Sequence, residues 1–200
     1  MPINYAGVTP NLVIDTRDLQ ASEKLVPHAQ DDGTTRLIAD QGGVCASMVV
    51  DWIQKCHDTP GGVTDKAQLK GSWALSIAHT AYRRGAFGNY DPSDKEKGFV
   101  ETHGLSVNAQ TSIEKRWWTF KRSRYQRVAQ ACAGMVGYAY ISIRGNGGHA
   151  LGFRRTGGVV EFFDPNEGIM QFNSAQDFAR WFPPYVINEY PNLLDTIIMI

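Results

Sequence analysis

The spacing of apolar residues changes near the middle of the chain. From about residue 43 to residue 57 they recur every three or four positions, as on one face of an amphipathic helix. This stripe consists of Cys45, Val49, Trp52 and Cys56, with Met48 and Ile53 beside it. The same spacing predicts a second helix over about 65–84, opened by Thr64 or Asp65, and a mostly helical segment over 112–134.

In the second half, short apolar runs are separated by glycine-containing turns, which is the pattern of antiparallel strands. The expected strands are 136–144, 149–155, 159–164 and 168–172. Helices followed by an antiparallel sheet predict an α+β domain. A short helix over 174–182 should end at Pro183-Pro184, and residues 195–200, DTIIMI, should form a closing strand.

Two segments lack a clear period. Residues 1–42 are rich in turn-forming residues and contain one weakly apolar stretch, NLVID. We expect them to form an arm or cap over a main domain that spans residues 43–200. Residues 85–99, GAFGNYDPSDKEKGF, are rich in glycine and charge and are expected to be a connecting loop.

The composition indicates a folded domain without a charge bias. The chain has 200 residues, 42% of them hydrophobic, and its 20 basic residues balance its 20 acidic ones. A chain of this length can bury a full core, and zero net charge argues against a specific nucleic-acid partner. Three cysteines without a CxxC spacing argue against a disulfide scaffold. The N-terminus lacks the basic and apolar regions of a cleavable signal peptide, so we expect any secretion to use a route without one.

Cys45 lies at the start of the first predicted helix, after the turn DQGG. A cysteine attacks as thiolate, and an ordinary thiol is mostly protonated at neutral pH. Unpaired backbone N–H groups and the positive end of the helix dipole favour the anion. Gly42 and Gly43 would let the backbone approach a substrate, and the amide of Gln41 could share an oxyanion with the backbone N–H of Cys45. Cys45 is therefore a candidate nucleophile, with simple packing under the helix cap as the alternative.

A base for this thiol can be found in the predicted hairpin. The Gly-Gly dipeptide between the second and third strands predicts a two-residue turn, and in its register Arg154 faces Glu161. His149 and Asp164 then share a face, one diagonal step apart. An imidazole held at one ring nitrogen keeps the other free for the thiol. Asp164 is the preferred partner of the ring, and Asn166 is a second candidate.

Three motifs follow one another along the chain: QGGVC before an apolar helix, GGHA before a strand, and FFDPNEG. With them the chain resembles the YopT/AvrPphB family of bacterial effector cysteine proteases, peptidase family C58, over roughly residues 38–190. The resemblance implies a papain-like catalytic domain over 43–200, in which the nucleophile helix packs on the C-terminal sheet. It also implies that no metal or cofactor is needed, and that a protein substrate is cleaved in the cytosol of a target or host cell.

By position, the resemblance assigns the roles of nucleophile, base and orienting residue to Cys45, His149 and Asp164. Papain-like enzymes carry their oxyanion glutamine six residues before the cysteine, where this chain has Ala39. Gln41 is the tentative oxyanion residue, and Asp40 and the local backbone are the alternatives.

Other thiol chemistries also fit a cysteine and a histidine in this arrangement. A peptidoglycan amidase of the NlpC/P60 kind pairs a helix-start cysteine with a strand histidine, but more usually takes its third polar residue from a strand close after the histidine. A thiol deamidase or acyltransferase could use the same triad. A binding module with a degenerate triad is the non-enzymatic alternative.

The segment KRWWTFKRSRYQR, residues 115–127, interleaves basic and aromatic residues and has no acid. Such segments can bind nucleic acid or anionic lipid. Because the chain has no net charge, a helix whose aromatic side chains pack inward is favoured, and a docking or membrane-facing patch is the alternative. The remaining histidines show no HExxH or similar spacing, so a metal site is not expected.

Overall fold

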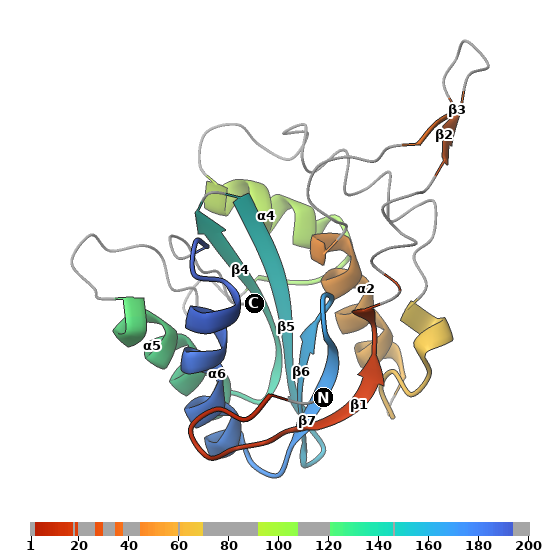
Figure 1. The fold of residues 1–200 in the computed structure, drawn as a ribbon. Coiled ribbons are helices and arrows are strands. Elements are labelled where there is room, and N and C mark those ends of the chain that lie inside the picture. The colour runs from red at the N-terminus through yellow and green to blue at the C-terminus, as the bar shows by residue number, and fades with distance from the viewer. Residues whose placement is uncertain are drawn as a thin grey trace.

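The fold is built on a five-stranded antiparallel sheet with the strand order β1-β7-β6-β5-β4 (Figure 1). The structure, a computed structural model, describes residues 3–17, 19, 27–29, 35–37, 45–59, 61–69, 92–107, 121–145 and 147–193. The strands of the sheet are β1 (Asn11–Asp15), β4 (Gly137–Gly145), β5 (Gly147–Thr156), β6 (Val159–Asp164) and β7 (Gly168–Phe172). A separate two-stranded ribbon consists of β2 (Pro27–Ala29) and β3 (Thr35–Leu37).

The four strands predicted in the second half are confirmed, and β6 and β7 have the predicted bounds. The fifth strand, β1, comes from the NLVID stretch and pairs with β7 at one edge of the sheet. The sequence did not predict that the N-terminal segment contributes to this sheet. A domain division at residue 42 stays a prediction.

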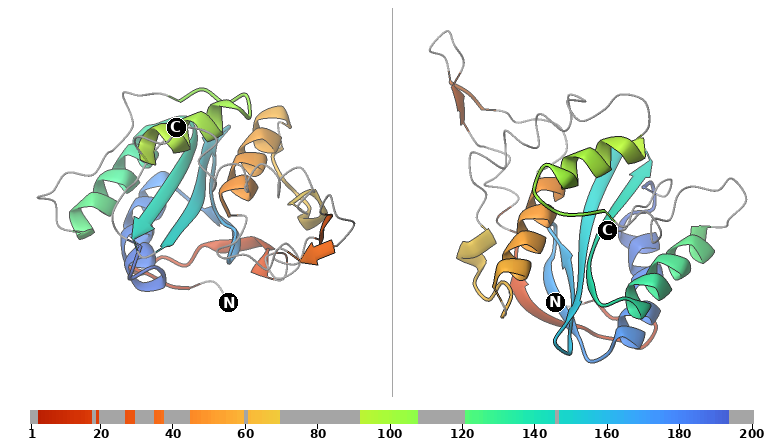
Figure 2. Two further views of the ribbon diagram at one scale, coloured as in Figure 1. Left: turned by 90° about the horizontal axis from the view of Figure 1, so that it is seen from above. Right: turned by 180° about the vertical axis from the view of Figure 1, so that it is seen from behind.

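Helices cover both faces of the sheet (Figures 1 and 2). The helix α2 (Cys45–Asp58) packs on one face, where it buries Phe163 and Ala150. On the other face α5 (Lys121–Gly134) and α6 (Ala175–Glu189) pack over Phe153 and Phe162. The strands therefore have one apolar core on each side, and α2 is the predicted first helix with its predicted stripe buried.

The segment predicted as a loop over 85–99 is partly helical, and this prediction was wrong. Its described part begins with α4 (Pro92–Glu101). Proline is well suited to the first turn of a helix, where its missing N–H is not needed. Phe99 and Val100, the only apolar pair in the helix, are both fully buried. Two buried apolar residues are too few to give a helical period in the sequence, which is why the helix was missed.

The prediction that Pro183-Pro184 would end the last helix was also wrong. The helix α6 continues through both prolines to Glu189. Aromatic residues on both sides of them are fully buried, including Phe182 and Tyr185. Burial of these side chains outweighs the lost backbone hydrogen bonds, since each buried aromatic contributes about 1.5–3 kcal/mol.

Three further expectations are only partly covered by the described residues. Of the predicted helix over 65–84, the structure describes a short 3-10 helix, η1 (Lys66–Leu69), in which the Asp65 carboxylate accepts a hydrogen bond from the Ala67 N–H at 2.8 Å. The closing strand over 195–200 and the two tryptophans of the basic segment lie outside the described residues. Within that segment Tyr125 is buried against Phe182, as an inward-facing aromatic would be. Among the described helices, none is both long and apolar enough to cross a membrane.

The position of α2 depends on a close contact with β5. A Cβ on Gly152 would lie 2.7 Å from Cζ3 of Trp52 and 3.3 Å from Cγ1 of Val49. We therefore expect Gly152→Ala to displace the helix and to lower the free energy of unfolding by about 1–3 kcal/mol, measured by urea denaturation. Gly61→Ala is the matched control, because a Cβ there meets nothing within 4 Å. Equal stability of the two variants would show that this contact does not position α2.

Candidate active site

The β5–β6 hairpin has the register predicted from its Gly-Gly turn. Gly157 and Gly158 adopt positive φ angles of 58° and 83°, as a type I′ turn requires. Arg154 pairs with Glu161 across the two strands. Residues at the far end of the hairpin are therefore aligned by the turn, although they lie several residues away from it.

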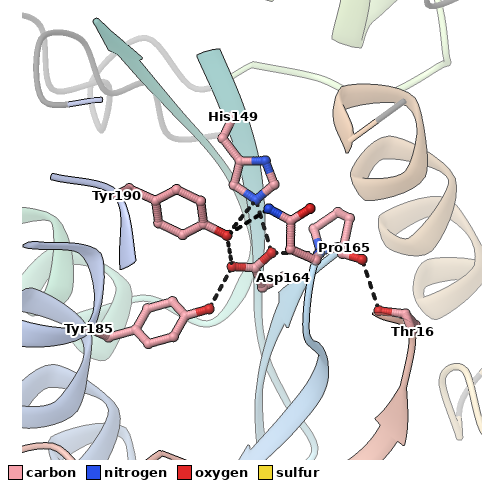
Figure 3. Close-up of polar contacts among 7 residues, drawn as sticks. Thr16, His149, Asp164, Pro165, Tyr185 and Tyr190 are labelled. Carbon is pink, nitrogen blue, oxygen red and sulfur yellow. Dashed lines mark hydrogen bonds and ion pairs between the residues drawn. The ribbon is translucent and has the colours of Figure 1, made fainter. Parts of the chain in front are cut away.

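His149, near the start of β5, meets Asp164, the last residue of β6 (Figure 3). The ring nitrogen Nε2 of His149 lies 2.9 Å from Oδ1 of Asp164. The side chains of the two residues are 6% and 0% exposed. Because the carboxylate binds Nε2, the nitrogen Nδ1 points away from it and is available to a second partner.

The Asp164 carboxylate is held by three further donors. Its Oδ1 accepts from the backbone N–H of Asn166 at 2.8 Å, and its Oδ2 accepts from the hydroxyls of Tyr185 at 2.6 Å and Tyr190 at 2.5 Å (Figure 3). Burial alone would raise the pKa of Asp164, but the charge of His149 and these hydrogen bonds lower it below its ordinary value. The carboxylate therefore stays ionised in the interior.

The same pair makes His149 an unusually strong base. Burial alone would lower the pKa of His149, but the neighbouring negative charges of Asp164 and Cys45 and the hydrogen bond to Asp164 raise it to about 10. At neutral pH the ring is therefore an imidazolium. The contribution of Cys45 to this shift requires the thiol to lie near the ring.

Cys45 is the first residue of α2 and is 6% exposed. Since Asp164 occupies Nε2, a thiol that bonded to this ring would have to use Nδ1. The other two cysteines, Cys56 and Cys132, lie in the cores, and burial raises the pKa of both thiols. Gln41, the tentative oxyanion residue, lies outside the described residues.

The turn that follows Asp164 is fastened to the N-terminal segment. The hydroxyl of Thr16 donates to the carbonyl oxygen of Pro165 at 3.1 Å (Figure 3). The backbone N–H of Thr16 donates to the carbonyl oxygen of Glu167 at 3.3 Å. Thr16 itself is completely buried. The segment expected to be an arm thus supports the carboxylate of the site.

Sequence reasoning missed Thr16, Tyr185 and Tyr190. Each contacts the site from a segment more than a hundred residues before it or some twenty residues after it, and none carries a motif or a local period. Asn166, the second candidate for holding the ring, instead donates its side-chain N–H to Tyr190 Oη at 3.0 Å. Among the described residues, no three His, Cys, Asp or Glu side chains are grouped so that they could hold a metal ion.

Comparison with known proteins gives a family and a fold. The model of the peptidase C58 family, described as Yersinia/Haemophilus virulence surface antigen, matches residues 15–194. The fold is similar to the crystal structure of the Pseudomonas avirulence protein AvrPphB, with a TM-score of 0.60 and 18% sequence identity over 78% of this chain and 89% of that chain. A search of curated proteins found no match.

The family match extends over nine-tenths of the sequence, from the last residue of β1 to the end of the described residues. It includes the strands that carry His149 and Asp164 and the helix that begins at Cys45. The α+β architecture agrees with the AvrPphB-like papain fold that the sequence predicted. The chain therefore belongs to the peptidase C58 family of YopT/AvrPphB-type cysteine peptidases, a family of virulence effectors.

Proposed function

We propose that Cys45, His149 and Asp164 form the catalytic triad of this peptidase. The observation that carries the proposal is the buried His149–Asp164 pair, whose second ring nitrogen is free for a thiol at the start of a helix. A raised imidazole pKa beside a cysteine favours the thiolate–imidazolium pair that a cysteine nucleophile needs.

The geometry gives each group a step in the reaction. The Cys45 thiolate attacks the scissile carbonyl carbon, and the oxyanion is stabilised by backbone N–H groups at the start of α2, with Gln41 as a further donor. The imidazolium of His149 then protonates the leaving amine, while Asp164 holds the ring in place. Water, deprotonated by the neutral ring, hydrolyses the thioester and restores the thiol.

The substrate of this activity is a protein in the cytosol of a target or host cell, into which the chain is delivered. Membership of a virulence effector family supports this setting. The described part of the basic–aromatic segment leaves Arg122 and Arg127 exposed on α5, while Tyr125 is buried. These cations form the part of the segment that would dock an acidic partner or an anionic membrane.

Alkylation by iodoacetamide as a function of pH, with the modified site mapped by mass spectrometry, tests the triad. Cys45 is expected to react well below pH 8 and at least about tenfold faster than Cys56 or Cys132, because only its thiol is paired with an imidazolium. His149→Ala should remove this advantage. Equal labelling of the three cysteines in the unmodified protein would contradict the proposal.

The products distinguish peptidase action from the other thiol chemistries. Mass spectrometry of a treated protein should show chain cleavage, which Cys45→Ala abolishes. A shift of about one dalton without cleavage would indicate a deamidase, and an added acyl group would indicate an acyltransferase. Release of fragments from purified peptidoglycan would indicate an amidase.

A further inference from the structure

The C-terminal end of α6 lies against the imidazole of His149. The ring of Tyr190, the residue that caps α6, stacks on the imidazole with ring centroids 4.6 Å apart and planes inclined by 21°. Its hydroxyl oxygen is 3.1 Å from Nε2 of His149 and donates to Oδ2 of Asp164 at 2.5 Å (Figure 3). One side chain therefore touches both members of the pair.

The position of Tyr190 is fixed from several directions. Its hydroxyl accepts a hydrogen bond from Nδ2 of Asn166 at 3.0 Å. Its carbonyl oxygen accepts from the N–H of Leu193 at 3.1 Å, and the carbonyl of Leu193 accepts from the hydroxyl of Tyr125 at 3.0 Å. Residues Tyr190–Leu193, which we name the strap, are thus tied to α5 at one end and to the His149–Asp164 pair at the other.

The strap also rests directly on Gly145, the last residue of β4. A Cβ on Gly145 would lie only 2.0 Å from the carbonyl oxygen of Asn192. The backbone of the strap can come this close only because residue 145 has no side chain. Since His149 follows within the same hairpin, this contact fixes the distance between the strap and the imidazole.

We propose that the strap is a built-in cover of the His149–Asp164 pair, in which Tyr190 is a positioning residue. The proposal rests on the proposed triad and adds to it. The phenol ring keeps water from one face of the imidazole and prevents the ring from tilting, so that Nδ1 stays directed at the thiol. Its hydroxyl ties the cover to the carboxylate, so that cover and pair move together.

Tyr185 has a different role in the same site. It is completely buried, and its hydroxyl donates to Oδ2 of Asp164 without a stacking contact to the imidazole. Tyr185 therefore orients the carboxylate from within the core, whereas Tyr190 covers the ring. This division predicts that only Tyr190 controls the access of water to His149.

Removing the cover should shift the pKa of His149, and with it the pH dependence of the reaction, in a defined direction. The groups that face the imidazole are Asp164 from β6, Cys45 from α2 and Tyr190 from α6, with Tyr185 and Glu167 behind the carboxylate. Water at the ring would screen these charges and also relieve the burial. Since the present balance raises the pKa of His149, screening moves it down toward its ordinary value. The thiolate–imidazolium pair is then lost at a lower pH.

The test compares Tyr190→Ala and Tyr190→Phe. In Tyr190→Ala the alkaline limb of kcat/KM and the titration of the His149 imidazole, followed by NMR, should both move down by about one pH unit. Tyr190→Phe keeps the ring and should recover most of both effects. Gly145→Ala pushes the strap away while every residue around the imidazole stays native, and it should shift both profiles in the same direction as Tyr190→Ala.

Tyr5→Phe is the matched control. It removes a hydrogen bond of 2.7 Å from a tyrosine hydroxyl to Glu189, beside Tyr190 but away from the imidazole, and should leave both profiles unchanged. Circular dichroism and thermal melting establish that each variant is folded. If folded Tyr190→Ala and Gly145→Ala keep both profiles within about twofold of the unmodified protein, while His149→Ala removes selective alkylation, the cover is wrong and the triad stands. If His149→Ala also has no effect, the triad itself is wrong.

Discussion

Replacing Asp164 by asparagine should lower kcat/KM by on the order of 10³-fold or more, as loss of the orienting acid does in comparable triads. Asparagine keeps the shape of the side chain but removes the charge that raises the pKa of His149. The imidazolium is then no longer favoured at neutral pH, and the amide can hold the ring in the wrong tautomer. Steady-state kinetics on a cleaved protein or peptide measure the loss.

The same variant has a pH signature in stability. The raised pKa of His149 stabilises the fold fully below its ordinary value of 6.5, and this contribution disappears as the pH rises through about 10. The lowered pKa of Asp164 contributes above its ordinary value of 3.8 and is lost on acidification below it. Both contributions should vanish in Asp164→Asn, which urea denaturation at several pH values would show.

Glu167→Gln is the control, because it removes a nearby carboxylate that contributes to the field at Asp164 from the same turn. Its kcat/KM should stay within about threefold, since the Glu167 side chain is partly exposed and its charge is screened by solvent. An Asp164→Asn enzyme that retained more than a tenth of the activity would contradict the assignment of this carboxylate as the orienting group.

The second large effect concerns the buried pair of Arg154 and Glu161. Nη1 of Arg154 lies 3.1 Å from Oε2 of Glu161, and Nε donates to the hydroxyl of Thr156 at 2.8 Å. The side chains of Arg154 and Glu161 are 3% and 10% exposed. Burial raises the pKa of Glu161 in spite of the neighbouring guanidinium, so the carboxylate is poorly solvated. Removing the guanidinium would leave this carboxylate without its charged partner in the interior.

Arg154→Ala is therefore expected to lower the free energy of unfolding by about 3–5 kcal/mol. Part of the loss is packing, because the guanidinium fills the space beneath Gly62, where a Cβ would lie 1.8 Å from Nη1. The double variant Arg154→Met/Glu161→Met replaces both charges by apolar groups of similar length. It should recover most of the stability and stay within about 2 kcal/mol of the unmodified protein.

Urea denaturation of the two single variants and the double variant, followed by circular dichroism, measures the coupling. Recovery in the double variant would show that the cost lies in the unpaired buried charge. A double variant as unstable as the worse single variant would instead show that the hydrogen-bonded pair itself holds the two strands of the hairpin together.

The parts of the site that the sequence predicted are those set by local rules. A Gly-Gly turn fixes the register of a hairpin, and the register places His149 and Asp164 on one face without any knowledge of the rest of the fold. An apolar stripe with one cysteine at its first position similarly predicted α2. In both cases the decisive residues lie within 15 positions of one another.

The parts that could not be predicted depend on tertiary packing. The helix α6 continues through Pro183 because buried aromatic residues on both sides hold it, and only this continuation brings Tyr190 to the imidazole. Thr16 reaches the turn after Asp164 because β1 joins the sheet at β7. Contacts of this kind leave no period or motif in the sequence, since the partners are brought together by the folded core alone.

The two halves of the proposed catalytic machinery belong to different layers of the molecule. Imidazole and carboxylate are fastened to each other within one β-hairpin, whereas the sulfur is delivered by a helix that leans on that hairpin at Gly152. Activity therefore depends on how closely α2 packs against the sheet. A shift of α2 by about 1 Å relative to the hairpin would separate the thiol from the imidazole and stop the reaction, while the hydrogen bonds within helix and sheet stayed intact. The protein can therefore lose its activity under conditions in which it is still folded.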